Sequence, residues 1–251
     1  MARRATVIGN YRRASRHFLL LEAGDSWYGE GQLGHQTQGK IVVEAMNHLG
    51  YDAMTLGELE FGLGLEELRR RVEEAAFPVV SANVVSTQGE KPLLAPYVVR
   101  EMGGHQIALI GLMTTDADEG IRRKTGDAYR VSDPFVVAHK YVAELAGRCD
   151  IIIVLSHLGV DQDQALAREI PEIDVIVGGH SMKVLQPALQ EPPNNTVILQ
   201  AGYRGEWIGY AQLHFDATGK VVRFENQVML LGPEVEDNPE MQALLDKYGG
   251  G

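Results

Sequence analysis

The sequence predicts a mixed α/β fold made as one domain over residues 1–251. Short apolar runs rich in Val, Ile and Leu recur along the chain, and stretches with helical spacing lie between them. That alternation is typical of buried strands connected by helices. A hydrophobic share of 45% and a charged share of 23% are ordinary for a globular protein, and the length suffices for one core.

Charge and hydropathy exclude several classes of partner. The formal net charge of −11 opposes a broad attraction to nucleic acid or anionic lipid, because such binding needs clustered cations. No apolar stretch approaches the roughly 18 residues that span a bilayer, and no apolar segment of signal-peptide length follows Arg4. We therefore expect no nucleic acid, no membrane span, and a cytoplasmic location for the chain as given. A natural upstream signal sequence would make it exported.

The elements of the first two thirds follow from apolar runs and helical faces. Six runs predict strands, at residues 17–22, 53–56, 79–81, 107–111, 151–156 and 175–177. One helix is predicted from the shared face of Val42, Ala45, Met46 and Leu49, and Gly50 ends it. A second is predicted from the shared face of Leu65, Leu68, Val72 and Ala75.

Capping residues and turns define the later elements. Ser132-Asp133-Pro134 predicts a helix start, with a capping residue and a proline in the first turn. Residues 196–200, 208–215 and 220–224 predict strands, the last two joined at 217–219 as an antiparallel pair. Asn238-Pro239 then predicts a final helix through Leu245.

Four candidate metal ligands follow predicted strands. Asp25 and Glu58 come after the first two runs, and His157 and His180 come after the fifth and sixth. Ligand sites of open α/β sheets lie beyond the carboxyl ends of the strands, so these side chains are expected on one rim. Imidazole and carboxylate together suit a divalent metal of the Mn, Zn or Fe type. Such a metal polarises a phosphoryl oxygen and lowers the pKa of water toward neutrality.

The motifs around these residues resemble the 5'-nucleotidase branch of the calcineurin-like metallophosphoesterases. The matching segments occur in the family's order and are Leu20-Leu21-Glu22-Ala23-Gly24-Asp25-Ser26, Gly57-Glu58-Leu59-Glu60-Phe61, Ser81-Ala82-Asn83-Val84, Ser156-His157-Leu158-Gly159 and Gly178-Gly179-His180. Further similarity lies at 92–97, 110–112 and 200–205, so the resemblance covers almost the whole chain. It implies a four-layer α/β/β/α sandwich of two mixed sheets, with two metals bridged by the aspartate at position 25.

The chain departs from the family pattern at the first metal. The family begins with a strand ending in Asp-x-His, and nothing upstream of Leu19 provides that motif. Where the family has Gly-Asn-His-Glu, the metal-binding asparagine becomes Glu58 and the acid-like histidine becomes Leu59. Where it has Gly-His-x-His, the last ligand becomes Met182, and a thioether is a poor ligand for these cations. The missing first strand would leave an exposed sheet edge, at which a homodimer could form by strand pairing.

The resemblance leaves one metal site instead of two. Asp25, His157 and His180 match ligands of the second metal, and Glu58 offers a carboxylate oxygen in place of the lost amide. We expect the family's C-terminal nucleotide-binding domain to be absent, and residues 237–251 match the start of the connecting helix. Asn83 matches a residue near the family's site and is a candidate substrate contact, with a turn-forming role as the alternative.

Two functions compete on these observations. The first is metal-dependent hydrolysis of nucleotides or other small phosphate monoesters by a metal-activated water, with no certain catalytic acid because Leu59 replaces the histidine. The second is a catalytically inactive binding or scaffold protein that keeps the fold, since each loss could cost orders of magnitude in rate. An incomplete N-terminus is a third explanation for the missing strand, but it does not account for Leu59 or Met182.

Overall fold

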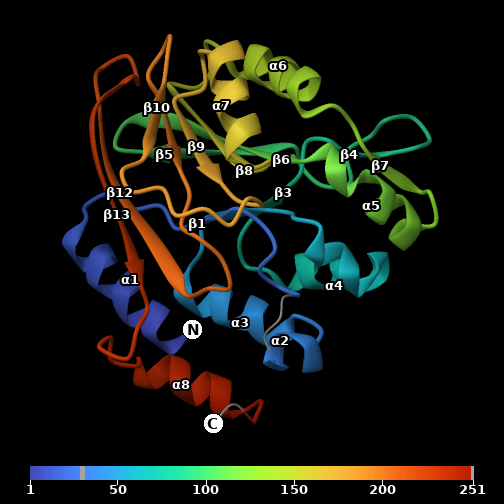
Figure 1. Ribbon diagram of the computed structural model, residues 1–251, viewed down its shortest axis with the longest axis vertical. Coiled ribbons are helices and arrows are strands. Elements are labelled where there is room, and N and C mark those ends of the chain that lie inside the picture. The colour runs from blue at the N-terminus through green and yellow to red at the C-terminus, as the bar shows by residue number, and fades with distance from the viewer. Residues whose placement is uncertain (29–31, 250–251) are drawn as a thin grey trace.

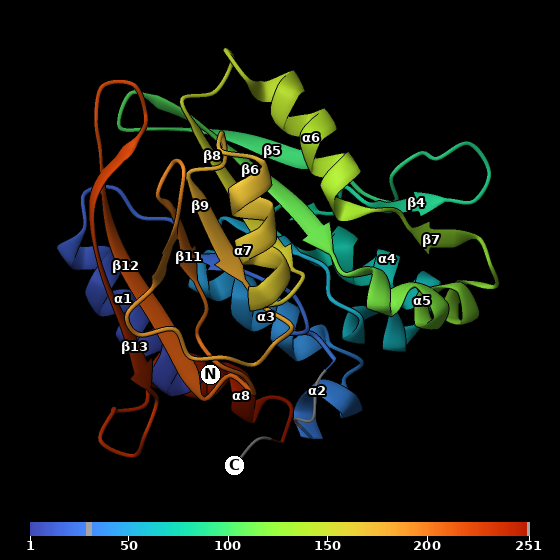
Figure 2. The ribbon, with the colours of Figure 1, turned by 45° about the horizontal axis from the view of Figure 1, so that its top comes forward.

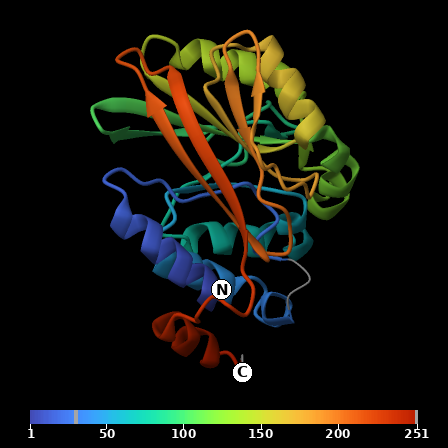
Figure 3. The same ribbon diagram turned by 60° about the vertical axis from the view of Figure 1, so that its left-hand side comes forward.

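The computed structural model describes residues 1–28 and 32–249 and arranges them in four layers. Two sheets face each other in the middle, and helices cover the outer face of each (Figure 1). Viewed from the side, α6 and α7 lie on one side of the strands while α1, α3, α4 and α8 lie on the other (Figure 3). This arrangement confirms the mixed α/β sandwich that the sequence predicted.

The larger sheet has six strands in the order β10-β11-β9-β8-β6-β5. Their bounds are β5 Tyr97–Met102, β6 His105–Met113, β8 Ile151–His157, β9 Val175–Gly178, β10 Leu189–Glu191 and β11 Thr196–Leu199. The four inner strands are parallel, and β5 and β10 are antiparallel edges. Strand β8 is buried along its whole length, as its continuous apolar run predicted.

The smaller sheet is parallel and consists of β1 Leu21–Glu22, β2 Ala53–Thr55 and β3 Val79–Val80 in that order. Its inner face packs on the larger sheet through a core that includes Ala53, Leu109, Ile153 and Val175. The carboxyl ends of β1, β2 and β8 meet in one region, because Asp25 after β1 and Glu58 after β2 lie beside His157 at the end of β8. That region receives the predicted ligands.

The outer layers are helical. Helices α6 Pro134–Leu145 and α7 Val160–Glu169 cover the six-stranded sheet (Figure 2). The outer side of the three-stranded sheet carries the remaining long helices. They are α1 Ala2–Ala14, α3 Lys40–Leu49, α4 Leu65–Glu74, α5 Asp118–Thr125 and α8 Pro239–Asp246. The short elements are α2 Gln32–Gln36, η1 Leu59–Leu63, η2 Thr115–Ala117 and the two-stranded pair of β4 Val84–Ser86 and β7 Tyr129–Val131. No helix in the described ranges has both the length and the apolar character that a bilayer crossing requires.

The predicted helix ends are confirmed. Gly50 ends α3 in the left-handed conformation with φ 67°, and its N–H reaches the carbonyls of Asn47 and Met46. Asp133 caps α6 by accepting hydrogen bonds from the N–H groups of Phe135 and Val136. Asn238 caps α8 in the same way.

A cavity of about 1500 Å³ lies between β1 and a C-terminal hairpin. The hairpin consists of β12 Trp207–Phe215 and β13 Val221–Leu230, an antiparallel pair as predicted, although β13 is longer than the run 220–224. Residues 19–27 line one wall and 207–215 the other. In the described part of the chain, helix α1 directly precedes β1. Ala23, Asp25, His157 and His180 line the same cavity.

Candidate metal centre

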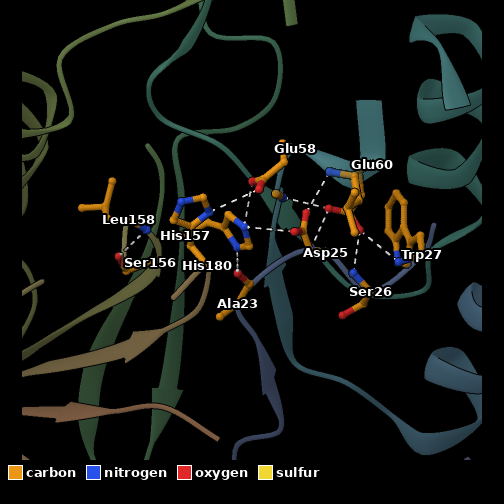
Figure 4. A network of polar contacts seen from close by, with 12 residues as sticks. Ala23, Asp25, Ser26, Trp27, Glu58, Glu60, Ser156, His157, Leu158 and His180 are labelled. Carbon is orange, nitrogen blue, oxygen red and sulfur yellow. Dashed lines mark hydrogen bonds and ion pairs between the residues drawn. The ribbon is translucent and has the colours of Figure 1, made fainter. Parts of the chain in front are cut away.

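Three of the four predicted ligands converge at the carboxyl ends of their strands. Glu58 Oε2 lies 2.9 Å from His157 Nε2, and Glu58 Oε1 lies 3.2 Å from His180 Nδ1. The ligand atoms of Glu58, His157 and His180 all lie within 4.8 Å of one another. The two imidazole rings meet edge to face, with centroids 5.2 Å apart. Figure 4 shows both rings directed toward the Glu58 carboxylate.

The polar atoms of this cluster fit a bound cation. Glu58 Oε2, His157 Nε2 and His180 Nδ1 are buried, and none forms a hydrogen bond among the described residues. Their separations are short, but their angles are not those of hydrogen bonds. Three buried ligand atoms that face one another in this way are the arrangement that a divalent metal would satisfy. One carboxylate and two imidazoles suit Mn, Zn or Fe better than Ca or Mg.

His157 is oriented by the β1 side of the site. The residue ends β8, its side chain is buried, and its Nδ1 lies 2.6 Å from the carbonyl oxygen of Ala23. A carbonyl only accepts, so Nδ1 carries the proton and donates it to Ala23. Nε2 therefore remains the ligating atom, and a hydrogen bond of this kind is what commonly orients a metal-bound histidine.

Asp25 lies beside the cluster and is held by its own loop. Its backbone adopts the left-handed conformation with φ 61°. Its Oδ1 accepts a hydrogen bond of 2.8 Å from the N–H of Leu59, and its Oδ2 lies 3.3 Å from His157 Nε2. The carboxylate thus adds negative charge next to the imidazole while being outside the three-residue group. The structure brings the fourth predicted ligand close, with one oxygen engaged by the backbone.

Glu60 is the functional residue that the sequence prediction did not assign. Its carboxylate is fully buried and accepts four backbone hydrogen bonds of 2.7 to 2.9 Å, from the N–H groups of Asp25, Ser26, Trp27 and Gly57 (Figure 4). The four donors belong to the two loops that carry Asp25 and Glu58. Glu60 therefore fixes those loops against each other. A carboxylate three residues after Gly57 was visible in the sequence, but its four partners were not.

The electrostatics of the metal-free cluster are those of an ion-pair network. Burial disfavours the imidazolium of His157, but the carboxylates of Asp25 and Glu58 outweigh it and raise the pKa of His157 to about 11. Burial would raise the pKa of Glu58, but the two imidazoles outweigh it and hold that pKa well below its usual range. The Glu58 carboxylate also raises the pKa of His180, and this effect outweighs the partial burial that would lower it.

The remaining predicted positions lie around or behind the cluster. Leu59 and Met182, which the sequence resemblance places where the family has histidines, are exposed by 40% and 63%. Asn83 is fully buried, and its amide group bonds to the backbone of Met113 and to the Ser132 carbonyl. These contacts are those of a structural residue that joins β4 to β6, so the substrate role expected for Asn83 gains no geometric support.

The fold and site match known proteins over almost the whole chain. The chain is 30% identical over 271 residues to a snake venom 5'-nucleotidase from Gloydius brevicauda, an alignment that covers 98% of this chain and 45% of that protein. A 5'-nucleotidase precursor from Thermus thermophilus superposes with a TM-score of 0.89 at 31% identity, covering 99% of this chain and 52% of that one. The calcineurin-like phosphoesterase YfkN from Bacillus subtilis shares the fold, with a TM-score of 0.87 at 23% identity, covering 99% and 88% of the two chains.

These findings define the class of protein. The chain is a relative of the 5'-nucleotidases and calcineurin-like phosphoesterases and corresponds to their N-terminal metallophosphatase domain. No protein-family model matches it. The chain spans about half the length of the curated 5'-nucleotidases it matches.

Proposed function

We propose that this chain is a metal-dependent phosphoric ester hydrolase of the 5'-nucleotidase type with one resident metal. The observation that carries the proposal is the set of three buried ligand atoms on Glu58, His157 and His180 that face one another and form no hydrogen bond among the described residues. The carboxylate of Asp25 adds a further negative charge to the site, because its Oδ2 lies 3.3 Å from His157 Nε2. A divalent metal held there would polarise a phosphoryl oxygen and lower the pKa of water.

The residues of the chain itself bind and orient. The Ala23 carbonyl keeps the proton of His157 on Nδ1, so that Nε2 faces the cluster. Glu60 holds the loops of Asp25 and Glu58 at a fixed spacing. Leu59 has no proton to give, so the leaving group has no acid at that position. We therefore expect turnover to be slower than in a two-metal phosphatase with a histidine there.

Nucleotides and other small phosphate monoesters are the proposed substrates. The supporting observation is that the similar proteins are 5'-nucleotidases. We also propose that residues 1–251 form one domain, that the final residues from 237 begin a connecting helix, and that the location is the one expected from the sequence.

A binding protein without turnover is the second candidate. The observation that favours it is the exposure of Leu59 and Met182 at the cluster, where an acid and a further ligand would be needed for a two-metal reaction. Metal and phosphate ester would then bind without cleavage. This alternative shares the metal site and differs only in the rate of hydrolysis.

The test measures manganese-dependent hydrolysis of AMP and p-nitrophenyl phosphate in the same samples in which bound metal is counted. Wild type is compared with His157→Ala and Glu58→Ala, and with His139→Ala as a matched control. His139 is an exposed histidine of α6 that pairs with Glu169 of α7 and makes no contact with the cluster residues.

The hydrolase proposal expects turnover that is lost in the first two variants and kept in His139→Ala. Bound metal with no turnover of either ester in the wild type would replace it by the binding protein. Absence of metal after manganese and zinc loading would overturn both.

A further inference from the structure

A second buried carboxylate, Asp163, lies behind the metal cluster and has no role in the reaction described above. It belongs to the first turns of α7, and its side chain is fully buried. Its Oδ1 accepts a hydrogen bond from the hydroxyl of Ser156, the residue before His157. Its Oδ2 is buried and has no hydrogen-bond partner among the described residues. A carboxylate buried with one satisfied oxygen is costly for a fold, so its retention calls for a reason.

Ser156 links Asp163 to the turn at the end of β8 through further hydrogen bonds. The Ser156 hydroxyl also accepts from the N–H of Leu158 at 3.2 Å, on the far side of His157 (Figure 4). The Ser156 carbonyl accepts from the N–H of Gly179 at 2.7 Å. The residues on both sides of His157 are therefore tied to one hydroxyl, and that hydroxyl is tied to Asp163.

The other oxygen of Asp163 lies against the end of β9. A Cβ atom placed on Gly178 would lie 2.6 Å from Asp163 Oδ2, so a larger residue there would displace the carboxylate. Gly178 precedes His180 by two residues. One carboxylate thus contacts the ends of both strands that carry the imidazoles, through Ser156 on β8 and directly at Gly178 on β9.

We propose that Asp163 is a positioning residue for the metal cluster, fixing His157 and His180 in a common direction toward Glu58 by its hydrogen bond to Ser156 on β8 and its packing beside Gly178 on β9. The inference rests on the proposed metal site and adds a residue to it that does not touch the metal. Loss of the contact frees the Ser156 hydroxyl and the space beside Gly178, so the turn after β8 and the segment leading to His180 can shift while the ladder between Ser156 and Gly178 persists. The two nitrogen donors then no longer converge on one point.

The variants separate positioning from general stability. Asp163→Leu and Ser156→Ala remove the contact, whereas Asp163→Asn keeps an oxygen that can accept from Ser156. Asp174→Asn is the matched control, because Asp174 is also a buried carboxylate and joins the opposite ends of the same strands. It accepts from the Ile152 N–H at 2.9 Å, precedes Val175 of β9, and pairs with Lys220 at 2.8 Å.

Three measurements are made on each purified variant: cobalt affinity with the visible spectrum of the cobalt protein, imidazole resonances of the metal-free protein by NMR, and the thermal midpoint. Positioning predicts that Asp163→Leu and Ser156→Ala bind cobalt about tenfold or more weakly with an altered spectrum, the usual cost of losing such support. It also predicts shifted His157 and His180 resonances. Asp163→Asn should recover most of the affinity, and Asp174→Asn should bind as wild type whatever its thermal midpoint.

The outcomes distinguish this inference from the metal proposal. Wild-type affinity, spectrum and imidazole resonances in a folded Asp163→Leu protein would overturn the positioning role. A loss in Asp174→Asn as large as that in Asp163→Leu would also overturn it, because stability alone would then explain both. If the wild type binds no metal while the imidazole resonances still shift in Asp163→Leu, the metal proposal fails and the positioning role stands.

Discussion

At the scale of residues, the four backbone hydrogen bonds to Glu60 are expected to contribute strongly to the free energy of unfolding. All four partners are N–H donors, so an amide in place of the carboxylate would direct its NH₂ group at two of them. We expect Glu60→Gln to lower the free energy of unfolding by about 2–4 kcal/mol, because two buried N–H donors lose their acceptor and face the NH₂ group instead. Urea unfolding measures this.

The matched control for that variant is Glu73→Gln on the exposed face of α4. It should change the free energy of unfolding by less than about 0.5 kcal/mol. A Glu60→Gln protein as stable as this control would contradict the role assigned to Glu60.

The proton on His157 makes metal binding depend on pH. The carboxylates that outweigh burial raise the pKa of His157 to about 11 in the metal-free protein, so its imidazole is charged at neutral pH. A metal must displace that proton, and affinity should rise about tenfold per pH unit for each proton released. Calorimetry in buffers of different ionisation enthalpy should find about one proton released per metal. Affinity independent of pH between about 6 and 9 would contradict this account.

At the scale of elements, the cap of α6 allows a clean test of the helix assignment. Asp133 Oδ1 accepts from the N–H groups of Phe135 at 2.8 Å and Val136 at 3.2 Å. Asp133→Ala should cost about 1 kcal/mol of stability, whereas Asp133→Asn keeps an accepting oxygen and should cost a few tenths. Equal losses in the two variants, measured by chemical denaturation, would show that the cap is not what Asp133 contributes.

The elements that could be predicted from the sequence are those with a continuous apolar run or a capping residue. The run at 151–156 became β8, and Asp133 and Asn238 began helices as expected. Helix α1 was not predicted, because its buried residues Ala2, Ala5, Val7 and Ile8 occupy only its first half and no apolar face continues through the second half. Strand β13 continues past Phe224 through the polar residues Glu225, Asn226 and Gln227, so its apolar run was shorter than the strand.

The candidate site divides in the same way. Glu58, His157 and His180 could be predicted because each follows a strand, and parallel strands bring their carboxyl ends to one rim. Glu60 and Asp163 could not, because their partners are backbone groups or a hydroxyl whose positions depend on the packed fold. Asn83 matched a site motif but is used in joining two strands. The sequence thus identifies candidate metal ligands by their spacing. The hydrogen-bond partners of buried polar atoms are known only from the three-dimensional arrangement.

At the scale of the whole molecule, the cavity between β1 and β12 bears on assembly. β1 is the edge strand of its sheet, and the hairpin of β12 and β13 forms a separate two-stranded sheet. Unpaired edges of this kind favour strand pairing between copies. Sedimentation velocity over about a hundredfold range of concentration tests the homodimer expected on this ground. A dimer fraction that grows with concentration is the predicted result, and a monomer throughout would count against strand pairing.

The proposed function depends above all on the number of metal ions that the whole domain holds. Equilibrium dialysis against manganese or zinc, followed by elemental analysis, counts them directly in wild type and in His157→Ala. We predict close to one ion per chain in the wild type, because Glu58, His157 and His180 form a single group of ligand atoms, and loss of that ion in the variant. No bound ion in the wild type, or an ion that persists in His157→Ala, would contradict the one-metal site.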